Sequence, residues 1–309
     1  MRTAVIGIGS NSLRMLVADI HQGRLKRLKR YREGLRVFAA LEANGAISRD
    51  MTQRACESVG RFRARAMEDG ACEVRLFATS AVRDAVNRQA FCDALQDSTG
   101  LTADVLSGEQ EARLSFLGAT EPTDRGLIDI GGGSTEIVGG RGGHIDAAIS
   151  LQLGAVRLFR AMPILTVQDA RRVEAFARDK VREGLTPEHA HASASGGWVG
   201  VGGTFTTTAA LVQRIPWDQR ELIHGFALGR EALEQAIDFL APMPVASRSA
   251  LSCMQPQRAD IVVHGMVILL ACMKELSLDS IRVSEYGNLE GYLKALYFGR
   301  HAENPAFCR

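Results

Sequence analysis

The ten residues from Leu127 to Glu136 constrain the fold of this chain more than any other stretch. An apolar run ends in Asp129, three consecutive glycines follow, and a second apolar run begins after Glu136. Three residues without a β carbon let the backbone turn tightly and place several N–H groups against a bound anion. A hairpin with a merely flexible turn rarely needs two flanking acids and two hydroxyl residues. The motif therefore predicts a strand–turn–strand unit that binds phosphate.

The residues of this motif divide into two chemical groups. The predicted phosphate donors are backbone N–H groups and side-chain hydroxyls, namely those of Gly131, Gly132, Gly133, Ser134 and Thr135. The two acids, Asp129 and Glu136, are predicted to hold a metal ion or a water molecule, because carboxylate oxygens are hard ligands.

A similar arrangement stands at the start of the chain, which makes an internal duplication plausible. A short apolar strand over 3–9 runs into a polar turn, and a second strand over 13–20 follows. This first turn is a second predicted phosphate site, formed by Gly9, Ser10, Asn11 and Ser12. Between the two motifs, and after the second, strands alternate with helices. We therefore expect an α/β protein with two similar domains over 1–120 and 121–309, whose last helix is free to pack back on the first domain.

A third glycine turn precedes a helix expected over 205–213. It consists of Gly202, Gly203 and Thr204, and we expect it to bind phosphate through backbone N–H groups and the threonine hydroxyl. A fourth glycine turn, over 287–291, opens the last helix. The strand expected over 24–38 is rich in Lys and Arg; we interpret it as a solvent-facing sheet edge protected by charge, in preference to a polyphosphate track.

The composition is that of a soluble globular protein, with 46% hydrophobic and 23% charged residues among 309. A net charge of +2 disfavours nucleic acid as a partner. The longest apolar run, 261–273, is too short to span a membrane, and the N-terminus lacks the apolar core of a signal peptide, so we expect a cytoplasmic protein. His189 and His191 have no third ligand nearby and are interpreted as loop residues. His264 is interpreted as a core or interface histidine.

The glycine turns resemble those of the actin/hexokinase/chaperone ATPase superfamily, whose duplicated ribonuclease-H-like domains clamp phosphates across an interdomain cleft. Within it, the chain is similar to the exopolyphosphatase and guanosine pentaphosphatase (Ppx/GppA) family in its short form. The segments that carry this resemblance lie at 9–12, 78–85, 107–114, 129–136, 201–204 and 258–260. The segment at 107–114 separates this family from sugar kinases and actin, which disfavours an ATP-dependent kinase.

The resemblance implies roles for four residues. Glu111 matches the catalytic glutamate that activates the attacking water, although spacing alone favours a solvated residue or an ion pair with Arg83 or Arg113. Arg83 matches an arginine near the phosphates. Asp129 and Glu136 match acids that hold Mg²⁺, the expected cofactor.

Two positions depart from the family pattern. The first turn of the family begins with an acid where this chain has Gly7, and the last motif has Asn288-Leu289 where the family commonly has an arginine. Retention of Glu111 and of the turns favours an active enzyme that releases terminal orthophosphate from inorganic polyphosphate. Hydrolysis of guanosine pentaphosphate and a non-hydrolytic sensor of polyphosphate or an alarmone remain open, as does a homodimer of the kind common in the family.

Overall fold

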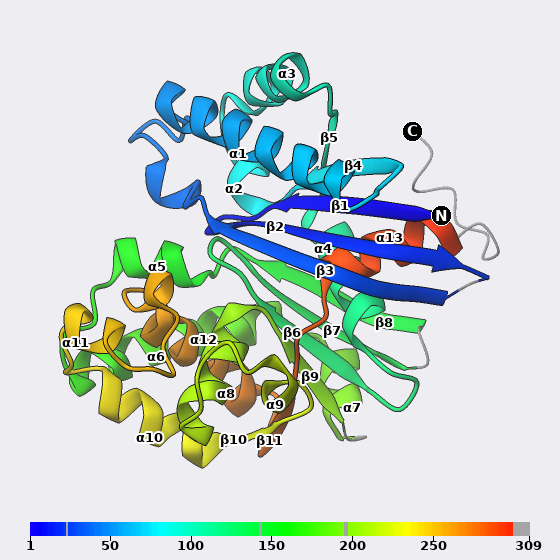
Figure 1. The fold of residues 1–309 in the computed structure, drawn as a ribbon. Coiled ribbons are helices and arrows are strands. Elements are labelled where there is room, and N and C mark those ends of the chain that lie inside the picture. Colours follow the sequence, from blue (N-terminus) through cyan, green and yellow to red (C-terminus); the bar gives the residue numbers. More distant parts are fainter. Residues whose placement is uncertain (23, 142–143, 195–196, 299–309) are drawn as a thin grey trace. The chain divides into compact units, whose positions relative to one another are not determined.

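The computed structural model describes residues 1–22, 24–141, 144–194 and 197–298, which form two compact units (Figure 1). Unit 1 contains Met1–Gly118 together with the last helix, α13 (Asn288–Phe298), and unit 2 contains Ala119–Gly287. Although α13 follows unit 2 in the chain, it packs against the sheet of unit 1. No helix in these described ranges is both long and apolar enough to cross a membrane.

Unit 1 is built on a five-stranded sheet. Its strands are β1 (Arg2–Ile8), β2 (Ser12–His21), β3 (Arg24–Gly34), β4 (Glu73–Ala78) and β5 (Ala103–Val105), in the order β3-β2-β1-β4-β5. The first three strands are antiparallel, whereas β1, β4 and β5 run parallel. The helices of this unit are η1 (Phe38–Ala40), α1 (Arg49–Glu68), α2 (Ser80–Arg83), α3 (Arg88–Thr99), α4 (Gly108–Ala119) and α13.

Unit 2 is built on a six-stranded sheet. Its strands are β6 (Gly126–Ile130), β7 (Thr135–Arg141), β8 (His144–Leu151), β9 (Trp198–Val201), β10 (Ala227–Gly229) and β11 (Ser280–Ser284), in the order β10-β11-β9-β6-β7-β8. Its helices are α5 (Ala155–Ala161), α6 (Val167–Gly184), α7 (Pro187–Ala194), α8 (Gly203–Gln213), α9 (Arg220–Ile223), α10 (Arg230–Leu240), α11 (Val245–Ser249), η2 (Pro256–Arg258) and α12 (Val262–Glu275).

The two sheets repeat one topology. In each, an antiparallel three-stranded meander comes first, and its first strand then pairs in parallel with the next strand of the sheet, β4 or β9. A further parallel strand follows on the same side, β5 in unit 1 and β11 in unit 2. The expected duplicated α/β architecture is therefore confirmed.

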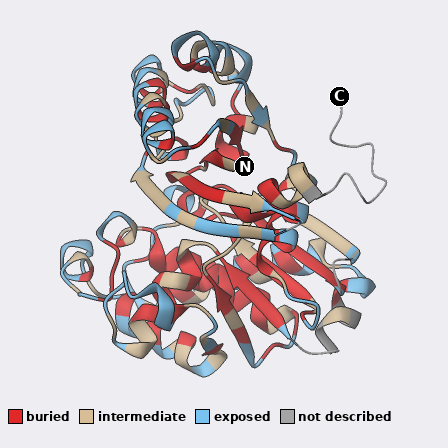
Figure 2. Ribbon diagram, turned by 45° about the vertical axis from the view of Figure 1, so that its right-hand side comes forward, coloured by how far each residue is buried: buried red, intermediate tan, exposed pale blue. Residues whose placement is uncertain are grey.

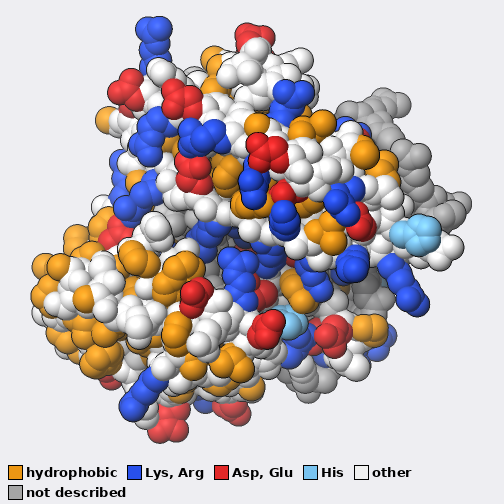
Figure 3. All heavy atoms as spheres, viewed as in Figure 1, with side chains coloured by type: hydrophobic (Ala, Val, Ile, Leu, Met, Phe, Trp, Pro, Cys, Tyr) orange, Lys and Arg blue, Asp and Glu red, His pale blue; other side chains and the backbone are white. Residues whose placement is uncertain are grey.

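Local sequence explains where several elements begin and end. The Ser48 hydroxyl accepts a hydrogen bond from the Met51 N–H and caps α1, as serine does at helix N-termini. Strand β3 was expected to reach Phe38 but ends at Gly34, because Arg36 adopts a left-handed conformation with φ of +59° and the chain then enters η1. Its basic residues do form a sheet edge. Lys and Arg side chains are scattered over the face of unit 1 shown in Figure 3.

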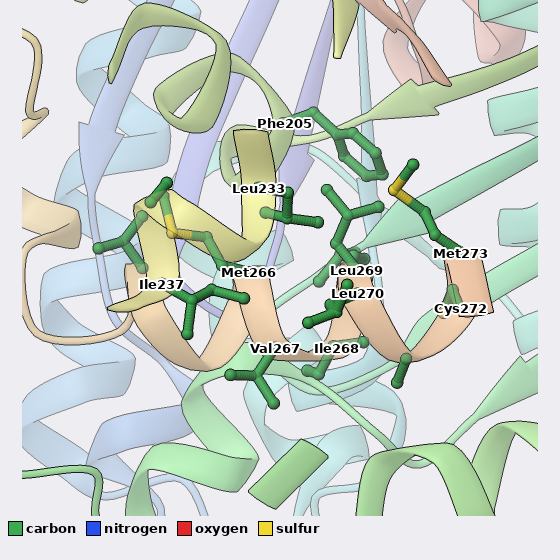
Figure 4. Packing of buried hydrophobic residues seen from close by; sticks show 14 of the residues in the cluster. Phe205, Leu233, Ile237, Met266, Val267, Ile268, Leu269, Leu270, Cys272 and Met273 are labelled. Atoms are coloured by element: carbon green, nitrogen blue, oxygen red, sulfur yellow. The ribbon is translucent and has the colours of Figure 1, made fainter. Parts of the chain in front are cut away.

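Each unit has its own hydrophobic core, and the central strands are buried (Figure 2). In unit 2, α12 buries every residue from Val262 to Met273 because it is apolar on all sides. It packs against α5, α6, α8 and α10, with Phe205 and Leu233 close to its own side chains (Figure 4). In unit 1, one hydrophobic cluster lies between the sheet and α13, where the Phe77 ring stacks on Tyr292 with centroids 5.1 Å apart.

Candidate functional site

In the first glycine turn, two carbonyls accept hydrogen bonds from neighbouring backbone, while two N–H groups have no acceptor among the described residues. The Gly9 N–H donates to the Ser12 carbonyl at 3.0 Å and closes the turn between β1 and β2. The Ser10 and Asn11 carbonyls accept hydrogen bonds from the N–H groups of Phe38 and Arg36, both at 3.0 Å. Within the described chain, the N–H groups of Ser10 and Asn11 have no acceptor, so they are available to an anion.

The second glycine turn repeats this design in unit 2. The Gly131 N–H donates to the Ser134 carbonyl at 2.9 Å, and the carbonyls of the three glycines accept hydrogen bonds from α5. The donors on α5 are the N–H groups of Ala155, Val156 and Arg157 and the Nε of the Arg157 side chain. The N–H groups of Gly132 and Gly133 have no acceptor among the described residues. With their carbonyls held by α5, these N–H groups are available to an anion, as in the first turn.

Gly154 makes this second turn possible. A β carbon placed on Gly154 would lie 2.4 Å from both the carbonyl carbon and the carbonyl oxygen of Gly132, and 2.5 Å from the carbonyl carbon of Gly133. Because the atoms in the way belong to backbone, a larger residue at 154 would displace the turn itself. Sequence reasoning did not single out Gly154 or Arg157.

The segment after β4 lies beside the first turn. The Thr79 N–H donates to the Ile8 carbonyl at 3.0 Å, and the hydroxyl oxygens of Ser10 and Ser80 lie 2.8 Å apart. Helix α2 starts at Ser80 and carries Arg83 at its C-terminal end. The first turn and the segment 78–85, which both carry the family resemblance, are therefore in direct contact in unit 1.

Arg83 pairs with Glu111, the predicted water-activating residue on α4. The Arg83 Nη1 donates to Glu111 Oε2 at 3.1 Å and to the Leu106 carbonyl at 3.0 Å, which fixes the guanidinium. Glu111 is 7% exposed, so it is not a solvated surface residue. Arg113 instead pairs with the exposed Glu109. Arg83 and Glu111 therefore form one unit at the N-terminal turn of α4.

Arg32 is a site neighbour that sequence reasoning assigned to the solvent-facing edge. Its Nη2 donates to the Ser12 hydroxyl oxygen at 3.0 Å, at the end of the first turn. The contact follows from the β2–β3 register, in which Arg32 pairs with Arg14 and Gly34 pairs with Ser12. The register also contains a shift between Val17 and Ala18, which the pattern of residue types does not indicate.

In unit 2, the two predicted metal ligands face the same side of the sheet. Asp129 and Glu136 are direct partners across the antiparallel β6–β7 pair, so their side chains lie next to each other. Glu136 is 1% exposed and accepts a hydrogen bond from the Ser150 hydroxyl at 2.8 Å. A β carbon on Gly202 would lie 3.2 Å from Asp129 Oδ1, which brings the third glycine turn to the same place.

The third turn lies at the N-terminus of α8, and the side chain of its threonine is buried. Gly202 has φ of +97° and caps α8 at its N-terminus, a conformation that favours glycine. The Thr204 side chain is buried against Gly265 of α12. Arg258 lies over Gly203, since a β carbon there would meet its guanidinium at 1.9 Å. The Thr135 hydroxyl of the second turn donates to the Leu153 carbonyl at 2.5 Å, so its hydrogen does not point at a ligand.

The donor atoms near Asp129 fit a hydrated Mg²⁺ better than an all-protein cage. The described residues contain no cluster of three or more His, Cys, Asp and Glu side chains that could hold a metal. Mg²⁺ commonly keeps several waters and binds through one or two carboxylates together with substrate phosphates. Two adjacent carboxylates satisfy that requirement. His189, predicted to lie in a loop, is instead buried in α7, with Nε2 3.3 Å from the Ile137 carbonyl; the side chain of His191 lies outside the described residues.

Unit 1 offers no such carboxylate at Gly7. A β carbon on Gly7 would lie 2.7 Å from Phe77 Cζ and 3.3 Å from a methyl of Leu289, so the space for a side chain is filled by apolar groups. The two departures from the family pattern, Gly7 and Leu289, therefore lie against each other. In the first turn, Asn11 Oδ1 is buried and has no hydrogen-bond partner in the described chain.

Known proteins resemble this chain over nearly its whole length. The chain is 32% identical to "Exopolyphosphatase 2" of Mycobacterium tuberculosis, over 96% of this chain and 98% of that protein. The crystal structure of a Ppx/GppA family member from Aquifex aeolicus superposes with a TM-score of 0.80 at 26% identity, covering 98% of this chain and 99% of the other. An exopolyphosphatase from Cytophaga hutchinsonii gives a TM-score of 0.85 at 25% identity, with coverages of 97% and 98%.

These superpositions confirm the predicted fold of duplicated ribonuclease-H-like units over nearly the whole chain. The family model for Ppx/GppA phosphatases matches residues 16–297. Because that match spans most of both units, the chain belongs to the Ppx/GppA phosphatase family.

Proposed function

We propose that this protein is an exopolyphosphatase that releases terminal orthophosphate from inorganic polyphosphate. The observation that carries the proposal is the pair of matching glycine turns, in which surrounding backbone and side-chain donors hold the carbonyls and leave N–H groups available to phosphate oxygens. The similarity to a mycobacterial exopolyphosphatase over nearly the full length of both chains supports polyphosphate as the substrate.

Glu111 is the proposed general base. A buried carboxylate can accept the proton of a water molecule as that water attacks the terminal phosphorus, a contribution of roughly 10²–10⁴-fold to the rate. Arg83 orients this carboxylate through the 3.1 Å hydrogen bond and offsets its charge in a site where anions must bind. The bond from Arg83 to the Leu106 carbonyl keeps the guanidinium in place.

The glycine turns are the proposed phosphate binders. Backbone N–H groups of Ser10 and Asn11 in unit 1, and of Gly132 and Gly133 in unit 2, donate to phosphate oxygens. Ser12 and Ser134 add hydroxyl donors, while the N-terminus of α8 at Gly202 and Gly203 adds a helix dipole. These contacts recognise phosphate groups irrespective of what the rest of the substrate carries.

Asp129 and Glu136 would hold the proposed Mg²⁺. The cation, when bound, supplies positive charge that polarises phosphoryl oxygens. The Ser150 hydroxyl positions one carboxylate oxygen of Glu136, and the β6–β7 register keeps Asp129 beside it. Since Gly7 provides no ligand, the carboxylates for the cation come from unit 2.

The test is the release of orthophosphate from long-chain polyphosphate by the purified chain, with and without Mg²⁺. Turnover that depends on Mg²⁺ supports the proposal. Binding of polyphosphate without turnover would indicate a sensor instead, a function that the apolar surroundings of Gly7 would favour. Competition between polyphosphate and guanosine pentaphosphate in one assay separates the two hydrolase activities.

A further inference from the structure

A cavity of about 430 Å³ in unit 1 opens beside the Arg83–Glu111 pair. Its polar lining comes from α2, α3 and the start of α4: Arg83, Arg88, Gln89, Cys92, Ser107 and Gln110. Glu111 is not among the lining residues, whereas its partner Arg83 is. One guanidinium is therefore shared between the proposed general base and this cavity, which we name the Arg88 cavity.

The electrostatics of the Arg88 cavity favour an anion. Two arginines line it and no Asp or Glu does, although Asp84 lies 3.6 Å from Arg83 Nε outside the lining. Arg88 has no ion pair or side-chain hydrogen bond with any described residue. Burial raises the pKa of the Cys92 thiol, so that group adds no negative charge. Because Arg83 is paired with Glu111, Arg88 supplies the uncompensated positive charge of the lining.

Two helices also begin at the wall of this cavity. Arg88 and Gln89 form the first turn of α3, which has no side-chain cap because the Asn87 amide is bonded to the backbone of Ile47. Ser107 and Gln110 cap the start of α4 by reciprocal hydrogen bonds of 3.1 and 2.8 Å. The positive ends of both helix dipoles add to the charge of the arginines.

We propose that the Arg88 cavity is a phosphate-binding subsite, distinct from the two glycine turns, that accepts interior phosphate units of a long polyphosphate chain, beyond the three units that tripolyphosphate supplies. Its volume lies within the range of pockets that bind small molecules and holds more than one phosphate group. Arg83 connects the subsite to Glu111, so occupancy of the cavity positions the substrate relative to the general base. The inference rests on the proposed hydrolysis of polyphosphate at Glu111.

The same chemistry would admit a second source of the ligand, free orthophosphate released by the reaction. The two sources differ in their kinetic signature. If the cavity binds interior phosphate units of the substrate, replacing Arg88 would change the KM for long chains and not the KM for tripolyphosphate. If the cavity binds orthophosphate, replacing Arg88 would change the inhibition constant of orthophosphate and leave the KM for both substrates unchanged.

The experiment compares wild type, Arg88→Gln, Arg88→Lys and the control Arg63→Gln, which removes the same charge from an exposed position on α1. Loss of one charge-assisted contact raises the KM for long-chain polyphosphate about tenfold in Arg88→Gln, with kcat within about twofold of wild type. The KM for tripolyphosphate does not change, Arg88→Lys recovers part of the loss, and Arg63→Gln matches wild type.

A rise of about tenfold in the inhibition constant of orthophosphate, with unchanged KM, assigns the cavity to the product. Identical behaviour of Arg88→Gln and Arg63→Gln in every measurement overturns the subsite. Calorimetric titration of the same proteins with long-chain polyphosphate and with orthophosphate tests the cavity even if wild type releases no phosphate. A weaker affinity in Arg88→Gln alone then supports the subsite although the proposed hydrolysis has failed.

Discussion

Replacement of Gly7 tests whether the acid missing from the first turn could simply be restored. A β carbon at 7 would lie 2.7 and 3.1 Å from two ring carbons of Phe77. Carbon atoms pack best at about 3.5–4.0 Å, so the ring must move by about 1 Å. It cannot do so freely, since Phe77 is fully buried and stacked on Tyr292.

Such overpacking costs about 1–3 kcal/mol, and we expect Gly7→Ala to lower the free energy of unfolding of unit 1 by about 2 kcal/mol. Gly7→Asp adds a carboxylate among apolar groups and should cost several kcal/mol more, because a buried charge loses its hydration. In a Phe77→Leu background the cost of Gly7→Ala should fall, since the smaller side chain yields space. Restoring the acid alone is therefore expected to unfold unit 1 and not to raise activity.

The assay is urea unfolding followed by far-UV circular dichroism and by tryptophan fluorescence. Both tryptophans of the chain, Trp198 and Trp217, lie in unit 2, so fluorescence reports that unit while the dichroism reports both. The matched control is Gly60→Ala in α1, where a β carbon meets nothing within 4 Å and should stabilise the helix by about 0.5–1 kcal/mol. A Gly7→Asp variant as stable as wild type and more active would refute the packing argument.

Three further predictions concern unit 2. Gly154→Ala should reduce phosphate release at least about tenfold, because the added carbon meets the backbone of Gly132 at 2.4 Å. Steady-state assays measure the rate, and unchanged activity would show that the second turn is not needed for catalysis. Arg248→Met should lower the free energy of unfolding by about 3 kcal/mol in urea titration, because three buried carbonyls that accept hydrogen bonds from Arg248 would lose their donor. A loss below about 0.5 kcal/mol would contradict this prediction. Burial lowers the pKa of His264 to about 4, below its value near 6.5 when unfolded, so the unfolded state alone binds this proton at intermediate pH. Stability should then fall by about 3 kcal/mol from pH 6.5 to 4, and His264→Leu should remove most of that slope in pH-dependent unfolding.

The repeated strand–turn–strand units could be predicted from the sequence, because their glycines, hydroxyl residues and acids are recognisable by residue type and order alone. Both turns close with the same hydrogen bond, Gly9 to Ser12 and Gly131 to Ser134, as a duplication requires. The pairing of Asp129 with Glu136 could also be anticipated, since a tight turn puts its two flanking residues opposite each other. The pairing of Arg83 with Glu111 was one of the alternatives for that glutamate, beside a solvated residue and an ion pair with Arg113.

What the sequence could not provide are contacts set by packing between distant segments. The end of β3 depends on the left-handed Arg36, whose N–H then holds the first turn through Asn11. The filling of the space at Gly7 depends on Phe77 and Leu289, which are 70 and 282 positions further along the chain. Thr204 was expected to face a phosphate, yet the structure turns its side chain to Gly265 of α12, because the register of α8 against α12 places it there. His189 was expected in a loop, but it lies in α7. Its ring is hydrogen-bonded to Thr186, which precedes α7, and to the carbonyl of Ile137 on β7.

The most direct test of the account is the rate at which Glu111→Gln releases terminal orthophosphate from polyphosphate in single-turnover experiments. The matched control is Glu109→Gln, because Glu109 lies two residues earlier on α4, is exposed and pairs only with Arg113 among the described residues. Loss of the general base predicts a rate roughly 10²–10⁴-fold lower for Glu111→Gln, with polyphosphate binding retained and Glu109→Gln equal to wild type. Full activity of Glu111→Gln would contradict the assignment of Glu111 as the base.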